Sequence, residues 1–203
     1  MDQENRIMEP STQPTENQNK ESYIKKYSST AWEFLKVVII ALIIVLPIRY
    51  FIFQPFIVKG ESMVPNFQQG DYLIVDEVSY KIHQPERGDV VVLKYPLDTR
   101  QRFIKRIIGL PGETIDIQAG IIRIAKDGNN IILDEKKYLP NITTTGSIHV
   151  VLGENTYYVL GDNRQFSSDS RIWGVLPKED IVGKVFVRLY PVNSISYIKS
   201  PTY

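Results

Sequence analysis

Ser62 and a lysine far along the chain are side chains that could act together as a nucleophile and its base. Ser62 lies in the stretch KGESMVPNF, residues 59–67. A serine becomes a nucleophile when a neighbouring base removes its proton. The chain has two histidines, His83 and His149, and neither lies in a serine-triad motif. A lysine is the other candidate for the base.

Lys105, in QRFIKRIIGLPGE, is the lysine whose surroundings suit that role. An amine acts as a base near neutral pH when burial or neighbouring cations lower its pKa. If this stretch is a strand, Phe103, Lys105 and Ile107 share one face, because side chains alternate. The two apolar neighbours favour a neutral amine. A solvated strand lysine is the competing interpretation, and the residues alone leave both open.

A third polar stretch, GDNRQFSSDSRIWGVLP, covers residues 161–177. Its Gly-Asp-Asn opening is typical of a turn. Ser167, Asp169 and Arg171 follow within five positions. As a surface loop this stretch would carry an ion pair of little energy. As part of a site, the serine and the ion pair could orient an amine base.

Composition excludes several other chemistries. Cysteine is absent, which rules out thiol catalysis, disulfides and cysteine-ligated zinc. The two histidines lack the spacing of metal ligands, and no metal or organic cofactor is expected. The formal net charge of +1 gives no reason to expect a nucleic-acid partner.

An apolar run precedes Ser62 and predicts a transmembrane signal anchor over residues 32–54. The run from Phe34 to Phe53 matches the ~20 residues that cross a bilayer as a helix. Lys36 and Arg49 lie toward its ends, where basic side chains reach the headgroups. A cleavable signal peptide would need small residues after the run, and a buried core helix is rarely so uniformly aliphatic. We therefore favour a single anchor helix.

The residues before the anchor predict its orientation. Residues 1–31 are rich in Gln, Asn, Glu, Ser, Thr and Pro, so a disordered tail is expected. Lys25, Lys26 and Lys36 precede or begin the span, which places the tail in the cytoplasm. Residues 55–203 are then expected to face outward.

The outward part, residues 55–203, has the sequence texture of a β domain. Short runs rich in Val, Ile and Tyr alternate with Gly, Pro, Asp and Asn. No segment after residue 60 keeps a helical period for three turns. Residues 113–158 look like an inserted β subdomain, with a hairpin signal at DGNN, residues 127–130. The expected fold class is mainly β, behind a single N-terminal transmembrane helix.

The three polar stretches, taken together and in this order, resemble the sequence boxes of type I signal (leader) peptidases. The stretches GDYLIVDEVSY and RGDVVVLKYP also resemble strand motifs of that family, and the likeness covers roughly residues 32–190. The resemblance implies an all-β catalytic domain of signal-peptidase type. It also implies a membrane-anchored endopeptidase that removes signal peptides from exported preproteins after small-x-small (Ala-x-Ala) sites, through an acyl-enzyme.

The resemblance also assigns roles to individual residues. Ser62 becomes the nucleophile and Lys105 the general base, with Ser167 hydrogen-bonded to the Lys105 amine. Asp169 and Arg171 form a structural ion pair, with Arg106 beside the carboxylate. In many Gram-negative members a hydroxyl residue stands two positions before the nucleophile, where this chain has Gly60. The backbone N–H of Ser62 is then the expected oxyanion donor.

The likeness further implies shallow pockets for the −1 and −3 side chains of the substrate. An extended substrate would add as a strand, which sends those two side chains to the same side. The alternative is that the lining candidates are core or membrane-facing residues. These candidates are Phe56, Val58, Met63, Phe67, Val92, Phe103 and Ile104.

The implied partners are secretory preproteins and membrane lipid, and the implied location is the plasma membrane with one span. A thylakoid processing peptidase is a related alternative. A self-cleaving repressor-type protease is disfavoured by the anchor and by the lack of a DNA-binding helix pair. An anchored β domain that only binds a partner is the alternative from another class. It would leave the surroundings of Lys105 unexplained.

Overall fold

The computed structural model describes residues 32–45 and 53–203, and this part of the chain is mainly β. The expected disordered tail, residues 1–31, lies outside the described residues, as do residues 46–52 of the expected anchor. The chain divides into two units, Met1–Pro47 and Ile48–Tyr203.

The first unit contributes one described helix. Residues 32–45, WEFLKVVIIALIIV, are α-helical. Among the residues that the structure describes, no helix has the length and apolarity needed to cross a membrane.

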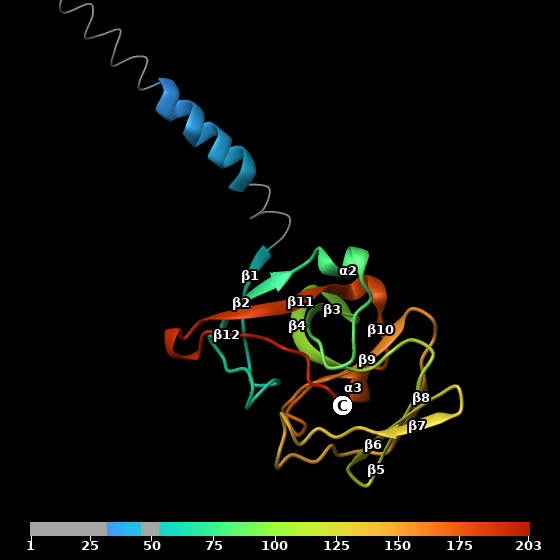
Figure 1. Cartoon of the computed structure of the whole chain (residues 1–203). Helices are drawn as coiled ribbons and strands as arrows, with labels where there is room; N and C mark the ends of the chain where they lie inside the picture. Colours follow the sequence, from blue (N-terminus) through green and yellow to red (C-terminus); the bar gives the residue numbers. More distant parts are fainter. Residues whose placement is uncertain (1–31, 46–52) are drawn as a thin grey trace, which may run out of the picture. The chain divides into compact units, whose positions relative to one another are not determined.

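The larger sheet of the second unit brings together strands from both ends of the domain (Figure 1). Its strand order is β1-β2-β11-β3-β4-β9-β10, with β12 paired to β11. All of these pairs are antiparallel. The strands are β1 (Phe53–Ile57), β2 (Tyr72–Asp76), β3 (Val90–Tyr95), β4 (Asp98–Gly109), β9 (Thr156–Leu160), β10 (Leu176–Pro177), β11 (Ile181–Tyr190) and β12 (Ser196–Tyr197).

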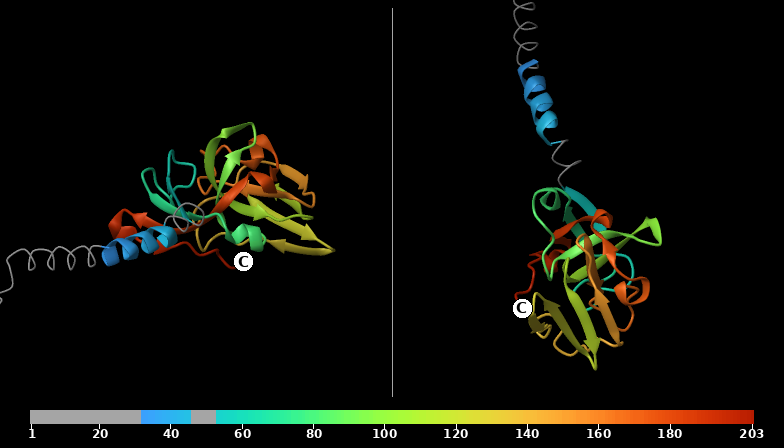
Figure 2. Two further views of the ribbon diagram at one scale, coloured as in Figure 1. Left: turned by 90° about the horizontal axis from the view of Figure 1, so that it is seen from above. Right: turned by 90° about the vertical axis from the view of Figure 1, so that its right-hand side faces the viewer.

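A second sheet lies to one side of the larger one (Figure 1, Figure 2). Its order is β7-β6-β5-β8, and its strands are β5 (Thr114–Gln118), β6 (Ile121–Lys126), β7 (Asn129–Ile132) and β8 (Ile148–Val151). All four strands fall within the range 113–158. Asp127 and Gly128, with φ of 50° and 82°, join β6 to β7. Asp-Gly favours such a two-residue hairpin turn, and the predicted hairpin signal is confirmed.

The helices of the second unit are all short. They are α2 (Ser79–Ile82) and α3 (Ser170–Trp173), with the 3₁₀ turns η1 (Lys178–Asp180) and η2 (Val192–Ser194). The Asp169 side chain caps α3 by accepting a hydrogen bond from the Arg171 backbone N–H. Within residues 53–203, no helix reaches three turns, as the sequence predicted.

The core explains why β3 reads as an unbroken apolar run. Val90 and Val92 pack in one cluster, whereas Val91 and Leu93 pack in another. Both faces of this strand are therefore buried, and alternation with polar residues disappears. A third cluster is formed mainly by the second sheet, with Ile115, Ile117, Ile122 and Ile124 among its members. Each fully buried side chain of this size contributes about 1.5–3 kcal/mol.

Candidate active site

Ser62 lies on the loop that joins β1 to β2, and backbone hydrogen bonds close this loop at its base. The Val58 N–H donates to the Asp71 carbonyl at 2.9 Å, and the Gly70 N–H donates to the Val58 carbonyl at 3.0 Å. Met63, next to Ser62, is 1% exposed and packs in the core. A buried neighbour and a closed base therefore fix where the serine stands.

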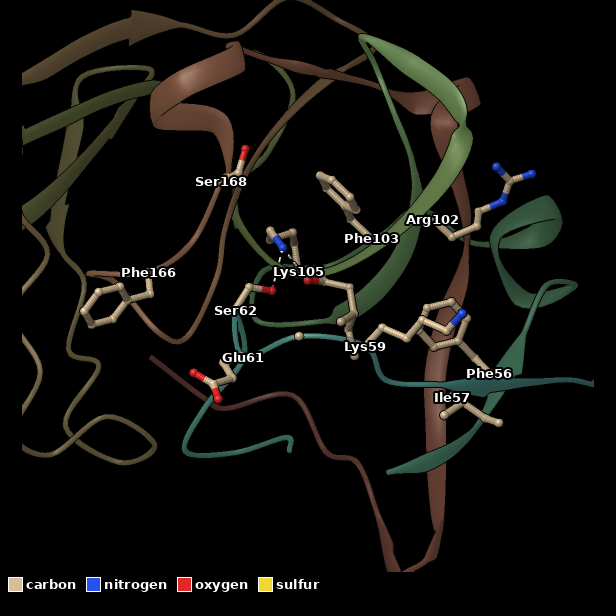
Figure 3. A pocket seen from close by; sticks show the side chains of 12 residues that line it. Phe56, Ile57, Lys59, Glu61, Ser62, Arg102, Phe103, Lys105, Phe166 and Ser168 are labelled. Carbon is tan, nitrogen blue, oxygen red and sulfur yellow. Dashed lines mark hydrogen bonds between the residues drawn. The ribbon is translucent and has the colours of Figure 1, made fainter. Parts of the chain in front are cut away.

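Lys105 meets Ser62 from β4. The Lys105 Nζ donates hydrogen bonds to the Ser62 Oγ at 2.8 Å and to the Ile104 carbonyl at 2.9 Å (Figure 3). The lysine is only 3% exposed, and its Nζ lies 5.1 Å from the centre of the Phe103 ring. Phe103 and Ile107 belong to one apolar cluster and Ile104 to another, so the predicted alternation along this strand is confirmed.

Burial lowers the pKa of the Lys105 amine into a range that suits proton transfer. Desolvation lowers the pKa of Lys105 to about 8, while the carboxylates of Asp169 and Asp162 oppose that shift. A base is most effective when its pKa lies near the working pH. The neutral amine would accept the Ser62 hydroxyl proton across the same short contact. The pair can therefore act as nucleophile and base.

Residues 161–163 form a tight turn whose groups donate hydrogen bonds to the backbone at Ser62. The Asn163 N–H donates to the Ser62 carbonyl at 3.0 Å, and the Asn163 Nδ2 donates to the Glu61 carbonyl at 3.0 Å. A Cβ added at Gly161 would collide with the Ser62 carbonyl oxygen and the Ser167 Oγ. Glycine is the residue that permits this close approach.

Asp169 and Arg171 form the expected ion pair. Two contacts of 2.8 Å join the Arg171 Nε and Nη2 to the two carboxylate oxygens of Asp169. Asp169 is completely buried and also accepts a hydrogen bond from the Gly161 N–H at 3.0 Å. The pair therefore holds the start of the turn that supports Ser62.

Arg106 has a different partner from the one expected. Its Nη2 lies 2.6 Å from Asp162 Oδ2 and its Nε lies 2.8 Å from Oδ1, so its ion pair is with Asp162 and not with Asp169. The strand pairing gives the reason. Arg106 lies opposite Leu160 on β9, and Asp162 follows that strand directly. The Asp169 carboxylate is turned instead toward Arg171.

The expected hydrogen bond from Ser167 to the Lys105 amine is not present. The Ser167 Oγ is buried and has no hydrogen-bond partner among the described residues. The Lys105 Nζ donates instead to Ser62 and to the Ile104 carbonyl. Ser167 still lies close to the site, because its Oγ is one of the nearest atoms to Gly161 on the side facing Ser62.

An open cleft of about 450 Å³ lies in front of the Ser62–Lys105 pair (Figure 3). Three of the expected substrate-pocket residues line it: Phe56, Phe103 and Ile104. Sequence reasoning missed six other lining residues, although one of them, Glu61, directly precedes the nucleophile in the chain. The six are Ile57, Lys59, Glu61, Arg102, Phe166 and Ser168.

The other four expected pocket residues belong to the core. Val58, Met63, Phe67 and Val92 are each 1–2% exposed, and they pack together with residues of β2 and β11. They do not line the cleft. All four side chains point into one buried cluster, so the alternative core interpretation holds for these positions.

Comparison with known proteins shows which family the chain belongs to. The chain matches the family model "Signal peptidase, peptidase S26" over residues 31–190. It is 33% identical to the probable signal peptidase I-1 of Synechocystis over 183 residues, covering 85% of this chain and 91% of the relative. It is 35% identical to signal peptidase I P of Bacillus subtilis subsp. natto over 181 residues, covering 86% and 97%.

Two further matches extend the comparison. Signal peptidase I of Leptolyngbya laminosa is 32% identical over 200 residues, covering 95% of this chain and 93% of the relative. The crystal structure of a signal peptidase I from Enterococcus faecalis V583 is 30% identical, with a TM-score of 0.43, over 51% of this chain and 98% of that one. On the family match and the full-length relatives, the chain belongs to the type I signal peptidases of the peptidase S26 family.

Proposed function

We propose that this signal peptidase cleaves preproteins with Ser62 as nucleophile and Lys105 as general base. The observation that carries the proposal is the 2.8 Å contact between the Lys105 Nζ and the Ser62 Oγ, made by a lysine that is 3% exposed. The removal of signal peptides follows from family membership. The Ser62–Lys105 dyad and the rule of cleavage after Ala-x-Ala are proposals that go beyond family membership.

In the first half of the reaction, the neutral Lys105 amine takes the Ser62 hydroxyl proton. The Oγ attacks the carbonyl carbon of the −1 residue and forms an acyl-enzyme ester. The peptide C–N bond breaks, and the Lys105 ammonium gives its proton to the leaving amine of the mature protein.

In the second half, Lys105 takes a proton from a water molecule, whose oxygen attacks the ester carbonyl. The ester C–O bond breaks, the Lys105 ammonium returns its proton to the Ser62 oxygen, and the signal peptide leaves as a carboxylic acid that loses its remaining proton to solvent. The backbone N–H of Ser62 is the proposed oxyanion donor, a kind of contact worth about 3 kcal/mol when well placed. The position of a side chain at Gly60 is open space, which leaves room for a water molecule as a second donor.

The substrate would bind as an added strand along the cleft. Among the described strands, β9 pairs with β4 only from Arg106 onward, so the cleft-lining stretch 102–105 has β3 as its one strand partner. An extended peptide can pair with such an edge. Phe56, Phe103 and Ile104 would then limit the size of the −1 and −3 side chains, which supports cleavage after Ala-x-Ala.

The same proposal includes a single membrane anchor over residues 32–54, with the N-terminus cytoplasmic and the catalytic domain extracytoplasmic. Its support is the apolar run and the lysines that precede it. Membrane lipid and secretory preproteins are the proposed partners, and fractionation of the source cells would separate a plasma-membrane enzyme from a thylakoid one.

The test uses the full chain in liposomes with a preprotein whose signal ends in Ala-x-Ala. Mass spectrometry of the mature product should place the cut after the second Ala. Replacing that Ala by Phe should abolish cleavage, because the bulky aromatic walls of the cleft exclude a large side chain. Cleavage at another position, or equal cleavage of the Phe substrate, would contradict the proposed rule.

A further inference from the structure

A buried ion pair joins the connection between β7 and β8 to the turn that hydrogen-bonds to the Ser62 loop. Arg164 is 1% exposed, and its Nη2 lies 2.7 Å from the Glu135 Oε1. Its Nη1 contacts the other Glu135 oxygen and the Thr144 Oγ1. Its Nε donates to the Gly161 carbonyl at 3.0 Å. The guanidinium therefore binds a carboxylate on one side and the backbone of the turn on the other.

That turn is short, and its far end holds the nucleophile. Gly161 begins it, and Asn163, two residues later, donates its N–H to the Ser62 carbonyl at 3.0 Å. The Asn163 Nδ2 binds the Glu61 carbonyl at 3.0 Å. Arg164 binds this turn, and the turn itself holds two successive carbonyls of the serine loop, those of Glu61 and Ser62.

Glu135 lies in the connection between β7 and β8, and hydrogen bonds within and around this connection hold it in place. The Leu139 N–H donates to the Glu135 carbonyl at 2.8 Å, and Leu139 is 1% exposed. Tyr138 donates its hydroxyl hydrogen to the Glu135 carboxylate. The Asn66 Nδ2, from the serine loop, donates to the Tyr138 carbonyl at 3.1 Å. The connection therefore contacts the Ser62 loop directly as well as through the ion pair.

From this chain of contacts we propose that Glu135 is a positioning residue for signal-peptide cleavage: acting through Arg164 and the 161–163 turn, it fixes Ser62 in place against Lys105. The proposal rests on the proposed dyad. It gives the second sheet a part in the reaction, although none of its strands lines the cleft among the described residues.

The physical reason is the cost of a buried cation without a partner. If Glu135 loses its charge, the guanidinium must draw in water or move, because an unpaired buried charge is unstable. Either response releases the Gly161 carbonyl and loosens the turn. A displacement of about 1 Å at reacting groups costs on the order of 10²-fold in rate. Glu135 lies outside the cleft, so substrate binding should not change.

The experiment compares two ways of removing the ion pair in the full-length enzyme. Glu135→Gln leaves Arg164 without a carboxylate. The double variant Glu135→Leu with Arg164→Met removes both charges and replaces them by apolar groups of similar size, which often restores stability. The readouts are kcat and KM for preprotein cleavage and the midpoint of thermal unfolding.

A second ion pair of the same design supplies the control. Arg87 contacts both carboxylate oxygens of Glu113, at 2.9 and 2.7 Å, and also donates to the Ile108 carbonyl. This pair is similarly buried: the Arg87 side chain is 14% exposed and the Glu113 side chain is 6% exposed. Neither residue lines the cleft. Glu113→Gln therefore tests what the loss of such a pair does through stability alone.

We expect Glu135→Gln to lower kcat at least tenfold with KM unchanged. The double variant should regain the wild-type thermal midpoint but keep a low kcat, because the Gly161 carbonyl has lost its donor. Glu113→Gln should lower the thermal midpoint and keep kcat. Full kcat in Glu135→Gln, recovery of kcat together with stability in the double variant, or an equal loss in Glu113→Gln would overturn the proposal.

Failure of the dyad would look different. If the dyad is wrong, the Ser62→Ala enzyme cleaves the preprotein, and this result does not depend on the activity of the Glu135 variants. The positioning role fails when Ser62→Ala is inactive in the same assay and Glu135→Gln still cleaves at the wild-type rate.

Discussion

The Lys105 Nζ lies 2.8 Å from the Ser62 Oγ, although the two residues stand 43 positions apart in the chain. Ser62 is held by the closed loop after β1, and Lys105 is held by β4, whose pairing with β3 places Val91 opposite it. The contact is therefore set by two rigid supports and not by the flexibility of a long side chain.

The pH dependence of cleavage should report the Lys105 amine. Burial lowers the pKa of Lys105 to about 8, and the neutral amine is the proposed base. We expect kcat/KM to rise with pH and to level off above about pH 9, measured from pH 6 to 10 with the preprotein substrate. A rate that is constant across this range would exclude Lys105 as the base.

Lys105→Met should stabilise the fold while abolishing activity. The native pKa lies below the ordinary value of 10.5, so the folded state binds the proton less tightly than the unfolded state. The charged amine therefore destabilises the protein fully below about pH 8, and this penalty disappears as pH rises toward 10.5. At pH 7 the variant should gain about 3 kcal/mol in free energy of unfolding. Denaturant unfolding at pH 7 and pH 10.5 checks this, and an equal gain at both values would contradict it.

Asp169→Asn should shift the pH profile toward acid. The Asp169 carboxylate opposes the lowering of the Lys105 pKa, and its neutralisation leaves Arg171 uncompensated nearby. The pKa of Lys105 should fall further, so the rising limb of kcat/KM moves to lower pH. Asp98→Asn is the control, because Asp98 pairs with the exposed Arg100 and should leave the limb in place. A shift toward alkaline pH would contradict this prediction.

Gly161→Ala should disable the enzyme through the position of Ser62. The added methyl group meets the Ser62 carbonyl oxygen and the Ser167 Oγ. Because the first of these contacts is with backbone, the serine loop must move, and a fall in kcat on the order of 10²-fold is expected. Gly153→Ala is the matched control, since its methyl group would meet the Thr156 Oγ1 at an ordinary 3.6 Å. Equal kcat values for the two variants would contradict the proposed close approach.

Phe56 and Val92 should respond differently to truncation, although both were expected to form substrate pockets. Phe56 lines the cleft, and Val92 is 2% exposed in the core. Phe56→Ala should admit larger side chains at −1 or −3 of the preprotein. Val92→Ala should cost about 2 kcal/mol of stability and leave this preference unchanged. A substrate panel with Ala, Val and Leu at these positions measures the difference, and broadened preference in Val92→Ala would restore it to the pocket.

The sequence features that led to the proposed pair, Ser62 and Lys105, are local. Ser62 stands in a short motif after an apolar run, and the strand around Lys105 shows its two faces by alternation. The hairpin at Asp127 and Gly128 is equally local, since the turn type depends on those two residues. Such features can be recognised without knowing which strands are neighbours.

The remaining site features depend on contacts between distant parts of the chain. Arg106 pairs with Asp162 because β9 lies beside β4, and no local pattern reveals that strand order. Glu135 meets Arg164 across the connection between two strands of the second sheet, 29 positions away. Val92 was misassigned for a related reason. Val92 lies on β3 between β4 and β11 and packs in the core, and the strand order that places it there is not a local feature.

The most direct test of the proposed mechanism is cleavage of one Ala-x-Ala preprotein by the wild-type enzyme, Ser62→Ala and Lys105→Met, all full-length and in liposomes. Thermal unfolding of the three proteins confirms that each is folded. We predict product from the wild type alone, with a loss of at least about 10³-fold in each variant. Turnover near the wild-type rate by a folded Ser62→Ala or Lys105→Met enzyme would contradict the Ser62–Lys105 dyad.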